Sequence, residues 1–311
     1  MERQRNLREA WGQALVELGR RNPAVVALEA DLGKSTRSIL FRQAFPDRHF
    51  EMGIAEQDMA STAAGLALAG KIPFMHSFAV FASGRAYDQL RNSICIPGLK
   101  VRVCGSSAGL SDFGDGKTHQ AVEDVAIMRA LPGMTVLCPA DGIECARIVA
   151  ALEELPGPAY VRVNRNDLPF VTDESRPYRI GEAALLREGR DAVIFACGVM
   201  VSRALDAAAR LERLGISARV VNVSTLKPLD PGIVGYAAGM KAIVTAEEHS
   251  VIGGLGSAVL EALRRERHAP VETVGIRDSF GRSAEDYEGL LRCYGLTAEA
   301  VEAAVRDILE S

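Results

Sequence analysis

The chain has 311 residues and a formal net charge of −4, with 48% hydrophobic and 24% charged residues. This balance is typical of an ordinary globular protein, and the length favours two domains. The charge offers no basic surface of the kind that binds nucleic acid. No apolar run approaches the 18 residues of a membrane span, and the first residues lead into an amphipathic helix rather than a signal peptide.

The six cysteines do not form any Cys-x-x-Cys pair, and most stand in apolar surroundings. We therefore expect reduced, buried thiols and a cytoplasmic protein. The five histidines are scattered along the chain, so no zinc site is predicted.

Short apolar runs alternate with helical patterns in the first half of the chain. Strands are expected at 24–28, 49–52, 72–75, 100–104, 134–138 and 159–163, with helices at 7–20, 56–69, 85–93, 121–130 and 143–152. This alternation predicts βαβ units and a mostly parallel sheet covered on both faces.

A polar segment with two prolines, residues 164–177, predicts a linker. A second α/β series follows it, with strands at 192–196, 218–223, 242–246 and 271–275 and helices at 201–214, 255–265, 284–292 and 298–310. The expected fold class is α/β, with two doubly wound domains of mostly parallel sheets. We place these domains at residues 1–175 and 176–311.

Residues 50–60 read as a strand end, a tight turn at Gly53 and the start of a helix at Glu56. By itself an acidic residue in the first turn of a helix only compensates the helix dipole. However, residues 53–57 (Gly-Ile-Ala-Glu-Gln) resemble the glutamate motif of the transketolase-type thiamine diphosphate enzymes. The resemblance implies that Glu56 hydrogen-bonds N1′ of the cofactor's aminopyrimidine. A carboxylic acid suits this role because it can share a proton with a weakly basic ring.

Three further residues are assigned to cofactor binding by the same resemblance. Phe78 and Phe81 would lie on one face of a helix, which core packing alone could explain. The family seats the aminopyrimidine against aromatic rings of this segment, where a flat ring can stack. Asp31 aligns with a family position near the thiazolium ring.

Residues 114–120 (Gly-Asp-Gly-Lys-Thr-His-Gln) end like a nucleotide-binding P-loop, but Ser111 stands where that motif needs its first glycine. The segment resembles the transketolase substrate loop instead. The resemblance implies that His119 donates a hydrogen bond to the developing oxyanion and that Asp115 holds a sugar hydroxyl.

Arg8, Ser35 and Arg165 align with family positions that contact a substrate phosphate, and arginine suits phosphate oxygens. Singly, each is equally compatible with a surface or capping role. Ser107 departs from the family, because many transketolases have a histidine there. This departure leaves room for an unusual acceptor.

Two motifs of the second half are expected to be structural. The glycines of residues 253–256 lack the spacing of a dinucleotide fingerprint and indicate close packing of a helix on a strand. Residues 247–249 (Glu-Glu-His) are interpreted as a charged turn.

The resemblance covers only the second and third domains of full-length transketolases. The chain is therefore similar to one subunit of a split transketolase, inactive alone and paired with a separate N-terminal, diphosphate-binding subunit in a two-plus-two assembly. That partner is expected to supply the Mg²⁺ ligands, and small sugars are the expected substrates. Three alternatives remain open: a beta-type subunit of a 2-oxo acid dehydrogenase, a deoxyxylulose-phosphate synthase-like enzyme, and a non-catalytic scaffold subunit.

Overall fold

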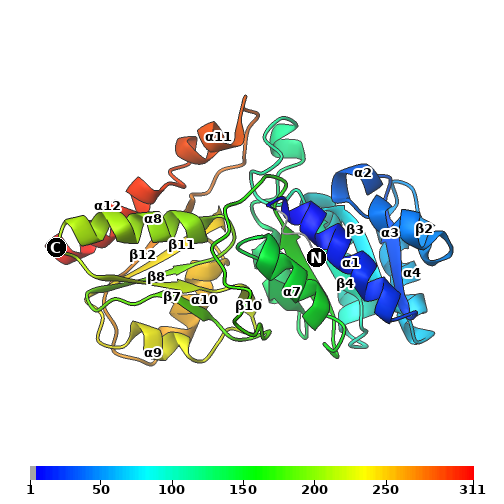
Figure 1. Cartoon of the computed structure of the whole chain (residues 1–311), viewed down its shortest axis with the longest axis horizontal. Coiled ribbons are helices and arrows are strands. Elements are labelled where there is room, and N and C mark those ends of the chain that lie inside the picture. Colours follow the sequence, from blue (N-terminus) through cyan, green and yellow to red (C-terminus); the bar gives the residue numbers. More distant parts are fainter. Residues whose placement is uncertain (1–4) are drawn as a thin grey trace.

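The computed structural model describes residues 5–311 and has two α/β lobes side by side (Figure 1). The first lobe runs from helix α1 to strand β6, and the second lobe runs from β7 to the C-terminus. The expected α/β class with two mostly parallel sheets is confirmed.

The first sheet has seven strands in the order β10-β5-β6-β4-β3-β1-β2, and all pairs are parallel except β10 with β5. Its strands are β1 (Val25–Glu29), β2 (His49–Glu51), β3 (Ile72–Phe78), β4 (Arg102–Ser106), β5 (Thr135–Leu137), β6 (Ala159–Val163) and β10 (Thr225–Lys227). The helical segments are α1 (Leu7–Arg21), α2 (Gly33–Thr36), α3 (Ile39–Ala44), η1 (Pro46–Arg48), α4 (Glu56–Leu68), η2 (Phe81–Arg85), α5 (Tyr87–Gln89), η3 (Leu90–Cys95), η4 (Gly116–Thr118), α6 (Asp124–Ala130) and α7 (Gly142–Ala151).

The second sheet has the order β12-β11-β8-β9-β7, and only the edge strand β7 is antiparallel to its neighbour. Its strands are β7 (Ala184–Arg187), β8 (Ala192–Ala196), β9 (Ala218–Asn222), β11 (Ala242–Ser250) and β12 (Val271–Ile276). The helices are α8 (Met200–Arg213), α9 (Ile233–Ala237), α10 (Leu255–Leu263), α11 (Tyr287–Cys293) and α12 (Ala298–Glu310).

Alternate residues of each buried strand face opposite helical layers. In β1, Val25 and Ala27 join the hydrophobic cluster that contains α1, whereas Val26 and Leu28 join the cluster that contains α4. This follows from the two-residue period of a strand and explains why β1 has four consecutive apolar residues, Val25 to Leu28. Each lobe is consequently a three-layer sandwich, with α8 above and α9 below the second sheet in Figure 1.

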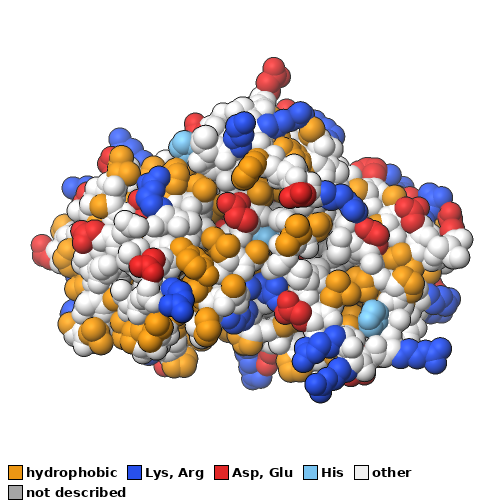
Figure 2. Space-filling view, turned by 180° about the vertical axis from the view of Figure 1, so that it is seen from behind, with side chains coloured by type: hydrophobic (Ala, Val, Ile, Leu, Met, Phe, Trp, Pro, Cys, Tyr) orange, Lys and Arg blue, Asp and Glu red, His pale blue; other side chains and the backbone are white. Residues whose placement is uncertain are grey.

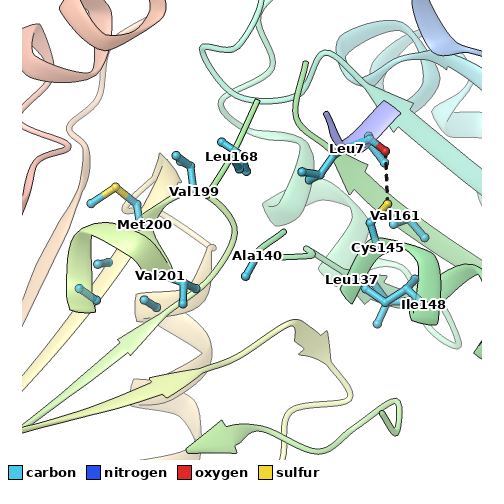
Figure 3. Packing of buried hydrophobic residues seen from close by; sticks show 14 of the residues in the cluster. Leu7, Leu137, Ala140, Cys145, Ile148, Val161, Leu168, Val199, Met200 and Val201 are labelled. Carbon is cyan, nitrogen blue, oxygen red and sulfur yellow. Dashed lines mark hydrogen bonds between the residues drawn. The ribbon is translucent and has the colours of Figure 1, made fainter. Parts of the chain in front are cut away.

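The hydrophobic core continues from one lobe into the other (Figure 3). Ala140 and Leu168 lie between first-lobe residues such as Ile148 and the start of α8 at Val199 and Val201. The segment 164–177 contains no helix or strand. It is held to the first lobe where the Asp141 carboxylate accepts the backbone N–H groups of residues 171 and 172, both at 2.7 Å.

Two expectations about local structure are wrong. Residues 247–249 do not form a turn, because they lie buried inside β11. The expected helix at 85–93 is broken into π-helical turns, η2 and η3, on either side of the short α5. Within residues 5–311, no helix combines the length and the apolar character needed to cross a membrane.

Candidate active site

The carboxyl ends of β1 and β3 form the point where the chain order of the first sheet reverses. From β1 the chain proceeds outward to β2, and from β3 it proceeds the other way through β4. Ligands of open parallel sheets bind in the crevice at such a point. Two residues that follow strand ends at this edge of the sheet have positive φ without being glycine: Asp31 (58°) after β1, and Ser107 (52°) after β4, the neighbour of β3.

Glu56 lies at the start of α4, next to this crevice. The turn before it requires a left-handed residue, which Gly53 supplies with φ 69°. The Glu56 side chain is only 1% exposed. Its Oε1 accepts a hydrogen bond from the Ser77 hydroxyl at 3.3 Å, and its Oε2 accepts one from the Arg85 guanidinium at 2.9 Å. The carboxylate is thus buried with only two hydrogen-bond partners in the part of the chain that the structure describes.

Phe78, at the end of β3, and Phe81, at the start of η2, stack with ring centroids 6.1 Å apart and planes only 13° from parallel. The His119 ring stands edge-on to both, at 5.3 Å from Phe81 and 6.1 Å from Phe78. The structure therefore brings together the predicted aromatic pair and the predicted loop histidine, which are about 40 positions apart in the sequence.

The loop that carries His119 is partly open to solvent. Asp115 is exposed and precedes the 3-10 turn η4, whereas His119 is half-buried and its Nδ1 is 2.9 Å from the Thr118 hydroxyl. Ser107, at the start of this loop, is buried, and its hydroxyl has no hydrogen-bond partner among the described residues.

Arg8, Ser35 and Arg165, the predicted phosphate-binding residues, lie close together. Arg8 donates a hydrogen bond to the Ser35 carbonyl oxygen at 2.9 Å. Burial, together with the nearby positive charges of Arg165 and Arg37, lowers the pKa of Arg8 to about 10. Arg165 also forms an ion pair with the buried Asp112. Such a concentration of positive charge favours an anionic ligand.

Asp31 is exposed, and its backbone N–H donates to the Glu51 carboxylate at 2.8 Å. The turn that carries Asp31 is shaped by Glu29, which the sequence did not reveal. The buried Glu29 carboxylate accepts from the Leu32 N–H at 3.1 Å and from the Thr36 hydroxyl at 2.6 Å. Burial raises the pKa of Glu29 to about 7.

Arg85 is another residue that the sequence analysis missed. Its guanidinium lies over the Phe81 ring at 4.4 Å while it bonds Glu56, so a flat group with N–H donors already fits between the ring and the carboxylate. The sequence could have indicated Arg85 through its i, i+4 spacing from Phe81, which places both side chains on one face of a helix.

These contacts test whether the residues suit an aminopyrimidine. A flat heterocycle with a hydrogen-bonding nitrogen needs an aromatic face and a buried acid, and Phe81 and Glu56 provide them. The residues therefore fit the ring, provided that Arg85 releases Oε2. Among residues 5–311 no cluster of acidic, cysteine or histidine side chains could hold a metal ion.

Comparison with known proteins identifies the family. A family model described as "Transketolase, pyrimidine binding domain" matches residues 3–171, and one described as "Transketolase, C-terminal domain" matches residues 181–301. The chain belongs to the transketolase family. Enzymes of this family depend on thiamine diphosphate.

Three similar chains are described as a section, a subunit or a split-gene form of a transketolase. A "Putative transketolase C-terminal section" from Methanocaldococcus jannaschii is 40% identical over 97% of this chain and 96% of its own length. A "6-deoxy-6-sulfo-D-fructose transketolase subunit SqwH" from a Clostridium species is 42% identical over 98% of this chain and 94% of its own. A solved chain described as "Split gene transketolase, inactive beta4 tetramer" is 49% identical, with a TM-score of 0.89 and 98% of both chains covered. The resemblance to a split transketolase subunit is thereby confirmed.

Proposed function

We propose that this chain provides the pyrimidine-binding half of a thiamine diphosphate-dependent transketolase. In this proposal the enzyme transfers a two-carbon ketol unit from a ketose, or a ketose phosphate, to an aldose acceptor. The observation that carries the proposal is the 1% exposed Glu56 carboxylate beside the stacked Phe78 and Phe81. A buried acid with so few partners suits a ligand that brings its own hydrogen-bonding nitrogen.

The roles of the site residues follow from their chemistry. Thiamine diphosphate, when bound, supplies the nucleophilic carbon that adds to the ketose carbonyl. Once Arg85 has released the Glu56 carboxylate, Glu56 would hold a proton at the pyrimidine N1′. The phenylalanine rings would orient the pyrimidine plane. His119, edge-on to both rings, would donate to the oxygen on which negative charge develops. The exposed Asp115 would accept a hydrogen bond from a sugar hydroxyl.

A phosphate on the donor or acceptor would lie against Arg8 and Arg165, near Ser35. The Arg8 guanidinium is half-buried, which strengthens its attraction for an anion. Arg165 would contribute a second guanidinium, although the carboxylate of Asp112 already neutralises part of its charge.

A partner chain would complete the site with the diphosphate-binding residues and the Mg²⁺ ligands. In support, the solved chain with 49% identity is described as an inactive tetramer of split-gene transketolase. Exposed apolar side chains also lie near both ends of α4: Ile54, two residues before Glu56 and next to the site, is 75% exposed, and Leu68 at the other end of the helix is 74% exposed. Hydrophobic side chains lie on the lower surface of the first lobe, on the left in Figure 2. Exposed apolar surface of this kind favours association, and we propose a two-plus-two assembly.

The test is reconstitution. The purified chain is combined with a transketolase N-terminal subunit, thiamine diphosphate and Mg²⁺, and ketol transfer from a ketose to an aldose is measured. We expect activity only in the mixture and its loss in Glu56→Ala. Turnover by the chain alone would contradict the need for a partner. Full activity of Glu56→Ala would favour a scaffold role instead.

A second candidate is supported by similarity to 1-deoxy-D-xylulose-5-phosphate synthases. The example from Syntrophus aciditrophicus is 36% identical over 97% of this chain, which spans 47% of that protein. Release of CO₂ from pyruvate by the reconstituted complex would support this second function. Ketol transfer without CO₂ release would support the first.

A further inference from the structure

The loop at residues 107–120, which carries His119 and Asp115, is closed at its base by backbone pairing. Gly109 and Ala121 exchange two hydrogen bonds, of 3.0 and 3.1 Å. Next to this pair, the Gln120 side chain donates back across the loop to the Asp112 carbonyl oxygen at 3.2 Å. The position of His119 therefore depends on where the base of the loop is held.

A side chain of the second lobe holds that base. Glu248, inside β11, accepts a hydrogen bond from the Leu110 N–H at 2.9 Å through its Oε1. Gly109 has a φ of 65°, and a Cβ atom there would lie 2.5 Å from the Glu248 carboxyl carbon. The loop backbone thus packs directly on the carboxylate, and only glycine permits this approach.

Glu248 is fixed in turn by residues of both lobes. The Tyr287 hydroxyl donates to its Oε1 at 2.8 Å, and the Asn164 amide donates to its Oε2 at 3.3 Å. The buried Arg162 donates to the Glu248 carbonyl oxygen at 2.7 Å and to the Ala121 carbonyl oxygen at 3.1 Å. The anchor is therefore rigid as well as close.

The adjacent residue, Glu247, has the same chemistry but points elsewhere. Its carboxylate is also buried, and it accepts the Leu255 and Gly256 N–H groups at 2.7 and 2.9 Å. It therefore caps α10 within its own lobe and makes no hydrogen bond to the loop in the described structure. The chain thus offers a matched control one residue away.

We propose that Glu248 is a positioning residue, through which the second lobe sets the placement of His119. The proposal rests on the proposed function, because His119 acts on substrate only there. In this proposal the Oε1 atom of Glu248 holds the Leu110 amide by a hydrogen bond, and the Leu110 amide in turn holds the base of the loop. The second lobe would then contribute to substrate handling without touching substrate.

The experiment compares Glu248→Ala, Glu248→Gln and Glu247→Gln. Amide hydrogen exchange of the segment 108–121 is measured by mass spectrometry on the whole chain. The kcat and KM for ketol transfer and the affinity for thiamine diphosphate are measured on the reconstituted complex. We expect faster exchange of the segment in Glu248→Ala and a fall in kcat/KM of about 10- to 100-fold, mostly in kcat, because misplacement by about 1 Å has effects of this size.

The two glutamine variants separate positioning from general destabilisation. Glu248→Gln keeps an acceptor for the Leu110 amide, so we expect it to recover most of the activity and to fold if the alanine variant does not. Glu247→Gln should leave exchange of the segment unchanged and kcat within about 3-fold. Cofactor affinity should stay near that of the parent chain in all three variants, because Glu56 and the phenylalanine rings are unchanged.

Unchanged exchange of the segment in Glu248→Ala would overturn the proposal, and so would a loss of kcat in Glu247→Gln as large as that in Glu248→Ala. If the complex proves to lack ketol transfer while Glu248→Ala still accelerates exchange of the segment, the proposed function fails and the anchoring role of Glu248 stands.

Discussion

Glu56 and Glu248 are both buried carboxylates, but their surroundings differ. Glu248 receives hydrogen bonds from a backbone amide, a tyrosine and an asparagine, and these donors come from both lobes. Glu56 has one hydroxyl at 3.3 Å and one arginine whose side chain is 45% exposed. The comparison teaches that a buried acid surrounded by fixed donors holds structure, whereas one with few and movable donors can receive a ligand.

The backbone conformation near the two residues also differs. Asp31 and Ser107, on the rim of the candidate site, are two of the four described non-glycine residues with positive φ. Such conformations are retained where the surrounding structure enforces them, often at ligand sites. Glu248 has no such φ; it lies where the pairing of β11 with β12 shifts register, between Ala246 and Ser250, and its side chain is fixed by hydrogen bonds from distant residues.

The comparison predicts the largest effect for Glu56→Gln. Activity of the reconstituted complex should fall by about 10²- to 10⁴-fold, the usual contribution of a group that transfers or holds a proton. Stability should change little, because the side chain keeps its shape. The measurement is ketol transfer with saturating cofactor, with the exposed Glu17→Gln as the control. Equal activity of both variants would remove Glu56 from the chemistry.

Arg162→Met should have the next largest effect, and the property to measure is stability. Arg162 is buried and pairs with Asp124 at 3.0 Å, and it also lies near Glu248. Its loss leaves buried carboxylates without compensation, so we expect the free energy of unfolding to fall by about 3–5 kcal/mol. Urea denaturation followed by circular dichroism measures this change. A loss below about 1 kcal/mol would show that the ion pairs of Arg162 with Asp124 and Glu248 contribute little to the stability of the fold.

The pH dependence of stability in Glu247→Gln tests a third buried carboxylate, which has a structural role like that of Glu248. Burial raises the pKa of Glu247 from 4.5 to about 7 in the folded chain. The folded state therefore binds more protons than the unfolded state between these values, and stability falls as the pH rises through this window. Glutamine lacks this titration. The free energy of unfolding of the variant relative to that of the parent chain should therefore rise by about 2 kcal/mol from pH 5 to pH 8. Urea unfolding at both pH values tests this, and a constant difference would contradict it.

The smallest predicted effect concerns Arg85→Ala. Since Arg85 is partly exposed, loss of its ion pair with Glu56 should lower the free energy of unfolding by only about 1 kcal/mol. The same substitution in a Glu56→Gln background should have less effect, because the charge that Arg85 neutralises is gone. The difference between the two measurements gives the strength of the pair. Equal losses in both backgrounds would mean that Arg85 acts only through its packing on Phe81.

The sequence predicted those parts of the fold whose pattern is local. Strands β6 and β8 were expected with the bounds that the structure has, because each is a short run rich in β-branched and aromatic residues. The helices α2 and α3 were missed, because α2 has only four residues and neither begins with a side-chain cap. The edge strand β10 was missed because its three residues pair with a distant strand.

For the candidate site, the sequence predicted which residues belong to it but not how they are arranged. The resemblance selected Glu56, Phe78, Phe81 and His119, whose close arrangement only the structure could show. Their roles remain predictions. Residues 247–249 were expected to form a charged turn, and this was wrong because the donors that satisfy the buried Glu248 come from distant parts of the chain. A local pattern contains no information about such partners.

Strand β10 has a consequence for how this protein can be divided. Thr225–Lys227 follow the linker in the chain, yet they complete the sheet that precedes it by pairing with β5. A truncation at the linker would remove this strand and leave β5 as an unprotected edge, open to pairing with other chains. Gene fission or domain shuffling at this boundary is therefore disfavoured, and the two lobes should be inherited and expressed as a single unit.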